Sequence, residues 1–373
     1  MRIAFLTNNR LPPREGIGRH LFEVATRLQD RGHACMILCP GELRGWRRER
    51  LRNLDVLHFP YFKLRPFHHA LLRPVLQRWL DDGADGADLL HVHLPLLPPL
   101  RSDLPRVVTF HTPMLTDTAA IPEKGVKPWL IKANARRFSA AYEQSHIDAA
   151  TRLIAVSSTV AGELEGHYRL DGKPVEVIAN GVDARFFPFV NGARRSRHVL
   201  YVGRLGYRKG LFRLLDALAR LDDPRIRLEL AGEGPLEGEL RTRARRLGLA
   251  ERVDFKGFLD RDRLREALKS AGCFVNPADY EGAPLTLLEA MAVGTPIVST
   301  PAGAREFGPQ APFWTCSADA ASLAATIMTA LDQPATARDR AVAARDLVER
   351  HYDWEVVVDR LLATYGGEER RAA

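Results

Sequence analysis

Short apolar runs alternate with segments of helical periodicity along nearly the whole chain, and this alternation constrains the fold more than any other feature. The first apolar run covers residues 3–7, a helical segment over residues 19–31 ends at Gly32, and a second apolar run covers residues 34–39. A strand, a helix and a strand in this order are typical of parallel sheets with crossover helices. The sequence therefore predicts an α/β fold.

The predicted strands form two series. The first continues at residues 56–59, 89–93, 107–111, 153–156 and 175–178, and the second occupies residues 199–202, 227–231, 253–256, 273–276 and 296–299. The polar stretch at residues 191–196 has the composition of a linker. We predict two doubly wound domains, residues 1–190 and 191–350, with residues 351–373 forming a helix that packs back toward the first domain. Because ligands of such sheets lie at the carboxyl ends of the strands, two facing domains predict a cleft between them.

Length, composition and charge exclude several classes of protein. The 373 residues suit two domains, and 46% hydrophobic with 27% charged residues excludes a disordered chain. The 54 basic and 46 acidic residues give a net charge of +8, which favours anionic ligands. No run approaches the ~18 apolar residues that span a bilayer, so we expect a cytoplasmic protein. The four cysteines do not suit a disulfide scaffold and are expected to be buried free thiols.

Two glycine-containing segments are suited to a phosphate ligand. Gly16 and Gly18 lie where a loop feeds a helix, and a helix N-terminus favours an anion. An ordinary connecting loop is the alternative there. Residues 203–210 follow a predicted strand and open a helix, and the cations Arg204 and Lys209 are placed to clamp a diphosphate. A solvated basic turn is the alternative for this segment.

Two glutamates separated by seven residues give the most specific signal. Glu281 falls in the loop after a predicted strand, and Glu289 falls on the helix that begins at Pro284 or Leu285. A carboxylate accepts hydrogen bonds from two hydroxyls at once, so one glutamate can hold a sugar ring and the other a ribose diol. The alternative assigns Glu281 to the helix dipole and Glu289 to a surface salt bridge, although Glu289 lies in a largely apolar helix.

Together these motifs resemble those of the retaining glycosyltransferases of family 4, over essentially the whole chain. The motifs that match in order and spacing are the Glu281 and Glu289 pair, the Gly-Arg-Leu and Lys-Gly of residues 203–210, the Asn-Gly-Val-Asp of residues 180–183, and residues 290–296. The resemblance implies the GT-B architecture of two Rossmann-like domains. It also implies transfer of a sugar from a nucleoside-diphosphate donor with retention of anomeric configuration.

The resemblance gives each charged residue of the second domain a role. Arg204 and Lys209 would bind the donor diphosphate and neutralise charge as the nucleotide leaves. Glu281 would hold hydroxyls of the donor sugar, and Glu289 would hold the ribose diol. No residue stands out as a nucleophile, so we expect the acceptor to attack the face that the leaving group vacates.

The remaining site residues implied by the resemblance act mostly through their backbone. The N–H groups of Leu285 and Thr286 would face the phosphates, and the backbone around Leu259 would meet the base. In the first domain, Gly16 would approach the β-phosphate and His111 would point at the donor sugar. A satisfied structural histidine is the alternative for His111.

This sequence departs from the family pattern at some positions. The family pattern itself includes no metal or cofactor. Glu15 and Pro284 stand where glycines are usual, and Pro284 cannot donate an N–H. Residues 260–262, Asp-Arg-Asp, resemble a metal-binding carboxylate pair of the other glycosyltransferase architecture. Because they precede a helical segment, an N-cap explains them better. We therefore expect a nucleotide sugar as co-substrate and no essential metal.

Several functional questions stay open. A nucleotide-sugar isomerase or epimerase of the same architecture and a nucleotide-sugar-binding subunit without turnover are the alternatives to a transferase. The acceptor could be a saccharide, a lipid-linked sugar or a small molecule, and no nucleic-acid-binding motif is present. Residues 44–78 hold nine basic and two acidic residues with interleaved aromatics, which suits peripheral contact with anionic lipid and a lipid-linked acceptor. A solvated arginine-rich face is the alternative for this patch.

Overall fold

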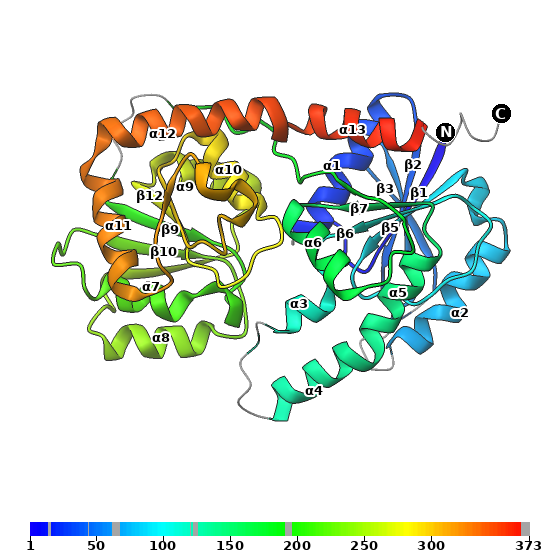
Figure 1. The fold of residues 1–373 in the computed structure, drawn as a ribbon, viewed down its shortest axis with the longest axis horizontal. Coiled ribbons are helices and arrows are strands. Elements are labelled where there is room, and N and C mark those ends of the chain that lie inside the picture. The colour runs from blue at the N-terminus through cyan, green and yellow to red at the C-terminus, as the bar shows by residue number, and fades with distance from the viewer. Residues whose placement is uncertain are drawn as a thin grey trace. The chain divides into compact units, whose positions relative to one another are not determined.

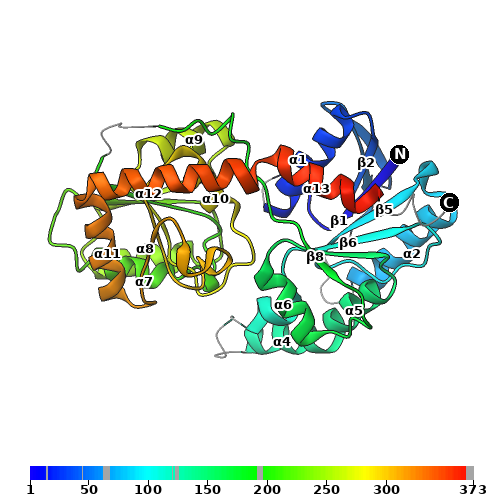
Figure 2. The same ribbon diagram turned by 45° about the horizontal axis from the view of Figure 1, so that its top comes forward.

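The computed structural model describes residues 1–13, 16–43, 45–61, 68–119, 121, 126–190 and 196–366. It divides the chain into two compact units. Unit 1 comprises Met1–Asn180 and Trp354–Ala373, and unit 2 comprises Gly181–Asp353. Each unit is a layered α/β structure in which helices lie on both sides of one sheet (Figures 1 and 2), so the predicted fold class is confirmed.

Unit 1 contains an eight-stranded sheet in the order β3-β4-β2-β1-β5-β6-β7-β8. Its strands are β1 (Arg2–Thr7), β2 (Ala34–Pro40), β3 (Arg47–Leu51), β4 (Leu54–Phe59), β5 (Leu89–Leu94), β6 (Arg106–Phe110), β7 (Arg152–Ala155) and β8 (Val175–Val177). All neighbours pair in parallel except β3 and β4. The central strands are buried on both faces, which explains why they read as continuous apolar runs.

The helices of unit 1 connect and cover these strands. They are α1 (Gly16–Asp30), α2 (His68–Asp81), α3 (Met114–Ala119), α4 (Val126–Asn134), α5 (Ala140–Asp148), α6 (Ser158–His167) and α13 (Trp354–Gly366), with the 3₁₀ helix η1 (Ala84–Gly86) and the π-helix η2 (Ala135–Ser139). In α1, Leu21, Val24, Ala25 and Leu28 are buried. Their spacing of three and four residues gives one apolar stripe that packs on the sheet.

Unit 2 contains a six-stranded sheet in the order β11-β10-β9-β12-β13-β14. Its strands, which all pair in parallel, are β9 (His198–Val202), β10 (Arg227–Ala231), β11 (Val253–Gly257), β12 (Cys273–Asn276), β13 (Ile297–Ser299) and β14 (Trp314–Thr315). Its helices are α7 (Leu211–Leu218), α8 (Glu237–Arg246), α9 (Arg261–Ser270), α10 (Leu285–Val293), α11 (Ala320–Asp332) and α12 (Pro334–Leu347), with short turns η3 (Tyr207–Lys209), η4 (Arg305–Gln310) and η5 (Val348–Tyr352).

The chain passes from unit 1 to unit 2 between Asn180 and Gly181, ten residues earlier than the predicted boundary. The physical reason is that the segment after Gly181 is already fixed to unit 2. The Val182 N–H donates to the Tyr352 carbonyl over 2.7 Å, and Phe187 is buried in the core of unit 2. Residues 191–195 of the predicted linker lie outside the described residues.

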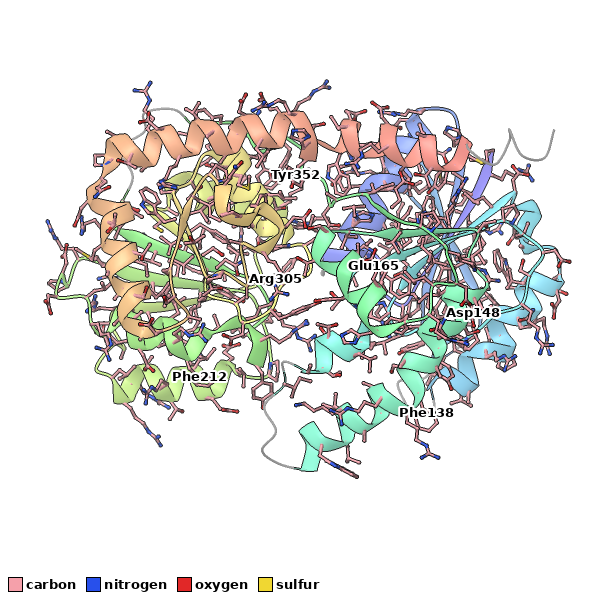
Figure 3. The ribbon with its side chains drawn as sticks, viewed as in Figure 1. Phe138, Asp148, Glu165, Phe212, Arg305 and Tyr352 are labelled. Carbon is pink, nitrogen blue, oxygen red and sulfur yellow. The ribbon has the colours of Figure 1, made fainter. Side chains whose placement is uncertain are left out.

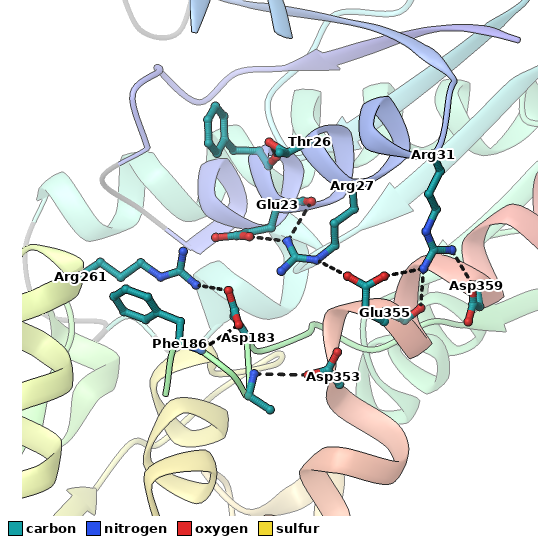
Figure 4. A network of polar contacts seen from close by, with 12 residues as sticks. Glu23, Thr26, Arg27, Arg31, Asp183, Phe186, Arg261, Asp353, Glu355 and Asp359 are labelled. Carbon is teal, nitrogen blue, oxygen red and sulfur yellow. Dashed lines mark hydrogen bonds and ion pairs between the residues drawn. The ribbon is translucent and has the colours of Figure 1, made fainter. Parts of the chain in front are cut away.

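Asp183 organises this first segment of unit 2, as Figure 4 shows. One carboxylate oxygen accepts a hydrogen bond from the Phe186 N–H at 2.9 Å, and the other pairs with Arg261 at 3.0 Å. The Arg261 guanidinium lies 4.0 Å from the centre of the Phe186 ring. The Asn-Gly-Val-Asp motif therefore has a structural task in which Asp183 ties the chain to the first turn of α9.

The C-terminal helix α13 belongs to unit 1, where it lies beside α1 (Figure 2). Arg31 of α1 pairs with Glu355 at 2.6 Å and with Asp359 at 2.5 Å, and Arg27 also pairs with Glu355 (Figure 4). Trp354 is 2% exposed, so the helix contributes to the core as well as to this ionic contact.

Candidate functional site

The candidate donor site of unit 2 lies at the carboxyl edge of β9 and β12. These two strands are neighbours, and the strand order reverses between them. In doubly wound sheets, ligands bind at such a reversal because the crossover connections leave its two sides in opposite directions. The loop with Arg204 and Lys209 follows β9, and the loop with Glu281 follows β12.

Lys209 and Glu281, predicted as separate parts of the site, contact each other directly. The Lys209 Nζ atom lies 2.5 Å from Glu281 Oε1, and the two side chains are 19% and 14% exposed. In such partly desolvated surroundings, an ammonium and a carboxylate interact more strongly than they do at a fully exposed surface. The pair places one cation and one hydroxyl acceptor side by side.

Further contacts join the two loops along their length. The Asp279 N–H donates to the Arg208 carbonyl over 2.8 Å, and Arg213 both donates to the Pro277 carbonyl over 3.1 Å and pairs with Asp279. Gly210 has a φ of +62°, and a Cβ atom built there would lie 1.9 Å from the Pro277 carbonyl oxygen. Only a glycine permits this approach, so the Lys-Gly pair of the motif combines a cation with the backbone contact that positions it.

We expect Gly210→Ala to destabilise unit 2 and to weaken the site. The added methyl group must push the two loops apart, at a cost of at least about 2 kcal/mol. Gly248→Ala is the matched control, because Gly248 has a φ of +71° with nothing within 4 Å of a built Cβ. The control should cost only about 1 kcal/mol. Urea unfolding of both variants measures the difference, and equal losses would show that the contact with Pro277 is not constraining.

Arg208 and Tyr201 belong to the same surroundings, although neither was predicted as a site residue. Burial lowers the pKa of Arg208, and the charges of Glu281 and Tyr280 oppose this shift. Burial raises the pKa of Tyr201, and the nearby charge of Glu281 raises it further. Arg208 thus adds a second cationic side chain close to Glu281. Its place directly before Lys209, in a loop already marked as basic, was the one available signal.

The N-terminus of α10 closes the site from a third side. The Thr286 hydroxyl lies 3.5 Å from the Val202 carbonyl, which places the start of α10 at the end of β9. Pro284 is the N-cap, and Leu285 and Thr286 are the first helical residues. The first N–H groups of a helix have no carbonyl partner within it, so they are available to an anion. Pro284 itself, at the cap, contributes none.

Three other predicted residues of unit 2 have different environments. Glu289 is 3% exposed and lies in the fully buried part of α10, which excludes a surface salt bridge. Arg204 is exposed and comes directly after Gly203, the residue that follows the end of β9. Leu259 is half-buried after β11, two strands away from β9 in the sheet.

Asp260 caps a helix, as predicted. Its carboxylate accepts a hydrogen bond from the Arg263 N–H at 2.9 Å, and Asp262 lies in the first turn of α9. This arrangement satisfies a helix N-terminus and complements its dipole. The four cysteines are free and buried, which was also predicted.

In unit 1, His111 is part of a buried cluster of histidines. It follows β6, and its Nε2 atom lies 3.1 Å from Nδ1 of His93 at the end of β5. The ring of His20, from α1, lies 4.9 Å from the ring of His111 and 5.3 Å from that of Trp354. Gly16, the exposed first residue of α1, lies one turn before His20.

Burial keeps these imidazoles neutral. It lowers the pKa of His20 to about 4 and that of His91 to about 3, and it places the pKa values of His93 and His111 well below 6.5. Positive charge on a neighbouring histidine of the cluster would lower the pKa values of His91, His93 and His111 further. His111 is therefore a neutral hydrogen-bonding group and cannot serve as a resident cation.

The same cluster has the ligand types for a transition metal. His20, His93 and His111 place one ring nitrogen each within 4.8 Å of one another, and neutral imidazole is a common zinc ligand. The group includes no carboxylate or thiolate. Because His93 and His111 already share a hydrogen bond, the cluster is satisfied in part without an ion.

The predicted basic patch at residues 44–78 is only partly described. Arg44 and residues 62–67 lie outside the described residues. Arg47 pairs with Glu49 at 2.9 Å, and Arg48 pairs with Asp85 at 2.6 Å. These acidic partners neutralise part of the positive charge on which the predicted contact with anionic lipid depends. Across the described helices, none has both the length and the apolar character needed to cross a membrane.

Comparison with known proteins identifies the family. A family model described as "Glycosyltransferase Family 4" matches residues 14–186, and one described as "Glycosyl transferases group 1" matches residues 183–347. A glycogen synthase of Mycobacterium tuberculosis is 30% identical over 385 residues, which cover 94% of this chain and 90% of the relative. The chain belongs to glycosyltransferase family 4. It is thus a glycosyltransferase, as the motifs implied.

Other relatives and solved structures agree with this assignment. A phosphatidyl-myo-inositol mannosyltransferase of Mycobacterium leprae is 29% identical, over 98% of this chain and 96% of the relative. A sucrose-phosphate synthase from Thermosynechococcus elongatus has a TM-score of 0.82 at 20% identity and full coverage of both chains. Anabaena HepE, solved with UDP and glucose, has a TM-score of 0.73 at 19% identity over 98% of this chain and 100% of that one. These structural likenesses support the GT-B fold of this glycosyltransferase.

Proposed function

We propose that this glycosyltransferase transfers a sugar from a nucleoside-diphosphate sugar to a hydroxyl acceptor, with retention of anomeric configuration and without a metal. The observation that carries the proposal is the Lys209 and Glu281 contact at the strand-order reversal of unit 2. It puts a phosphate-binding cation next to a hydroxyl-binding carboxylate. A nucleoside-diphosphate sugar presents these two groups on adjacent parts of one molecule.

The positive charges stabilise the leaving group. As the bond between the sugar C1 and the phosphate oxygen breaks, negative charge grows on the diphosphate. Lys209, Arg204 and the first N–H groups of α10 supply positive charge where it develops, which lowers the barrier without a metal. When the diphosphate takes over the Lys209 ammonium, the carboxylate of Glu281 becomes available to the sugar hydroxyls. Glu289 is the candidate for the ribose diol.

Retention follows in this proposal from attack on the face that the leaving group vacates. The acceptor oxygen forms the new bond to C1, and its proton passes to the leaving phosphate oxygen. A covalent route would need a carboxylate nucleophile at C1, and no residue of the sequence stands out for that role. Trapping of a glycosyl-enzyme adduct would refute this part of the proposal.

The first unit is the proposed acceptor side. His111, held neutral by burial, offers a hydrogen bond and no charge to the donor sugar. Acceptors left open by the sequence are a saccharide, a lipid-linked sugar and a small molecule. Contact of residues 44–78 with anionic lipid stays a prediction, with a solvated arginine-rich face as its alternative.

A thermal-shift screen with UDP, GDP, ADP and dTDP tests the donor assignment, followed by product analysis with the matching nucleotide sugars. We expect one nucleotide to stabilise the protein and product to form only when an acceptor is present. An isomerase or epimerase would form product without an acceptor, and a binding subunit would form none.

Dialysis against EDTA should leave the rate unchanged. A loss of rate restored by Zn²⁺ would overturn the metal-independent mechanism and point to the histidine cluster.

A further inference from the structure

One helical segment of unit 1 exposes an unusual number of large apolar side chains. Trp129 is 64% exposed, Leu130 54%, Ile131 37% and Phe138 44%. They are four of the twelve exposed large hydrophobic residues found among the described residues, and they lie within ten positions of one another. Scattered exposed apolar residues are ordinary, but a local concentration marks a surface that binds something apolar.

The segment that carries them is a continuous helical rod. It runs through α4, η2 and α5, from Val126 to Asp148. In Figure 1, α4 extends away from the sheet of unit 1, and Figure 3 labels Phe138, which lies on η2 directly after α4. Ala135 and Ser139, which flank Arg136, Arg137 and Phe138, are buried, so one side of the rod packs inward. The consecutive residues Trp129, Leu130 and Ile131 point about 100° apart and cover more than half of the circumference of α4.

The charge of the first part of this segment has one sign. Residues 124–142 contain five basic residues, at positions 124, 127, 132, 136 and 137, and no acidic residue. Arg136 and Arg137 are exposed next to Phe138, and the Arg137 guanidinium lies 6.0 Å from the centre of the Phe138 ring. The next acid along the chain, Glu143, is buried and accepts hydrogen bonds from Tyr168 and from the Met114 N–H. It therefore does not neutralise the surface.

We infer that Trp129, Leu130, Ile131 and Phe138, flanked by Arg136 and Arg137, form a surface that binds an anionic lipid bilayer. Apolar side chains with tryptophan among them enter the boundary between headgroups and acyl chains, and adjacent arginines attract anionic headgroups. A protein partner would not require a stretch of 19 residues without one acid. The surface brings the enzyme to lipid-linked acceptors, and this second step rests on the proposed function.

Co-sedimentation with vesicles tests the inference, using pure phosphatidylcholine and an equal mixture of phosphatidylcholine and phosphatidylglycerol. We expect binding to the anionic vesicles, little binding to the neutral ones, and weaker binding as salt is raised. The double variant Arg136→Glu/Arg137→Glu should bind at least about tenfold more weakly, since each basic residue near a charged surface contributes roughly fivefold. The double variant Trp129→Ser/Leu130→Ser should also bind at least about tenfold more weakly, because it removes two apolar side chains that enter the bilayer.

Matched controls come from unit 2. Phe212→Ser changes an apolar residue that is 36% exposed (labelled in Figure 3), and Arg245→Glu/Arg246→Glu reverses an exposed arginine pair on α8. Both should bind vesicles as the unaltered chain does. Equal losses in the controls, or unchanged binding in the α4 and η2 variants, would overturn the inference. Light scattering tests whether a second copy of this chain binds the surface instead. Loss of a dimer in the α4 and η2 variants, with unchanged vesicle binding, would identify that second copy.

Nucleotide thermal shifts on the same variants separate the two proposals. All should respond to the preferred nucleotide as the unaltered chain does, because the changes lie outside the donor site. Transfer to a soluble acceptor should likewise be retained, whereas transfer to an acceptor embedded in anionic vesicles should fall with binding. Absence of any nucleotide response would count against the donor assignment and leave the vesicle result standing.

Discussion

Lys209→Ala is expected to lower kcat by 10²-fold to 10³-fold, about 3–4 kcal/mol of transition-state stabilisation. The ammonium contacts Glu281 in a partly buried site at the ends of β9 and β12, where a leaving diphosphate would develop charge. Its charge matters most in the transition state, so kcat should fall more than donor affinity. Steady-state kinetics with the donor identified by the nucleotide screen measures both quantities.

The control for this variant is a second lysine of unit 2. Lys269 lies on α9 and pairs with Glu266 at 3.1 Å, so Lys269→Ala also breaks a lysine and glutamate contact. It should leave kcat unchanged. Glu281→Gln keeps the shape of the side chain and removes its charge, and it should lower activity by a similar order to Lys209→Ala. If Lys209→Ala retained kcat within threefold, the donor site would have to lie elsewhere.

The strands of unit 2 could be predicted from the sequence because of their burial. The buried positions of parallel strands with helices on both sides are mostly apolar, and on this ground residues 227–231 and 273–276 were predicted as strands at the bounds of β10 and β12. By contrast, β3 was missed because its sequence is Arg-Arg-Glu-Arg-Leu, an antiparallel edge strand with mostly solvated side chains. The two residues of β14 are too few for any pattern to reveal.

The site was predictable to the level of residue type and loop, and less so in its contacts. The sequence put Lys209 and Glu281 in loops after two strands, but only the sheet order makes those loops neighbours. The burial of Arg208 was not foreseen, because spacing alone does not say which side of a short turn faces inward. Gly210 lies in the segment predicted to bind phosphate, but the close approach of Pro277 that requires a glycine there appears only in three dimensions.

The histidine cluster of unit 1 shows a signal that could have been used. His91 and His93 alternate along a predicted strand, which places both on one face of the sheet. His93 and His111 end neighbouring parallel strands, β5 and β6, so their side chains meet. Only His111 was predicted as a site residue. His20 could not have been added, since the packing of α1 against β1 and β2 decides its depth.

Acid is expected to unfold unit 1 selectively, because five of its histidines are buried and neutral. His20, His91, His93, His111 and His146 are each at most 5% exposed. Burial lowers the pKa of His20 and His146 to about 4 and that of His91 to about 3, with His93 and His111 also well below 6.5. In the unfolded chain all five imidazoles take up protons near pH 6.5, whereas burial keeps them neutral at this pH in the folded unit.

The sign and size of the effect follow from proton linkage. A histidine with a lowered folded pKa contributes full stability above pH 6.5, and that stability is lost as pH falls toward the folded value. The three histidines with a folded pKa of about 3 or 4, His20, His91 and His146, each lose about 1.4 kcal/mol at pH 5.5, roughly 4 kcal/mol together, and His93 and His111 add to the loss in the same direction. Glu143 opposes this loss, because burial raises its pKa to about 7 and it regains about 1.5 kcal/mol between pH 7 and 5.5. The net loss is at least about 2.5 kcal/mol, which is a large fraction of the whole stability of many domains.

Urea unfolding followed by circular dichroism at pH 7.5, 6.5 and 5.5 measures this loss, and hydrogen exchange with mass spectrometry assigns it to a unit. We expect the transition of Met1–Asn180 to move to lower urea with acid, and that of Gly181–Asp353 to move much less. His351→Gln changes an exposed histidine and should leave the profile unaltered. His146→Leu should flatten it by about 1.4 kcal/mol per pH unit. A stability independent of pH between 7.5 and 5.5 would mean that the cluster accepts protons while folded, and His111 would then carry a charge that the proposed mechanism does not allow.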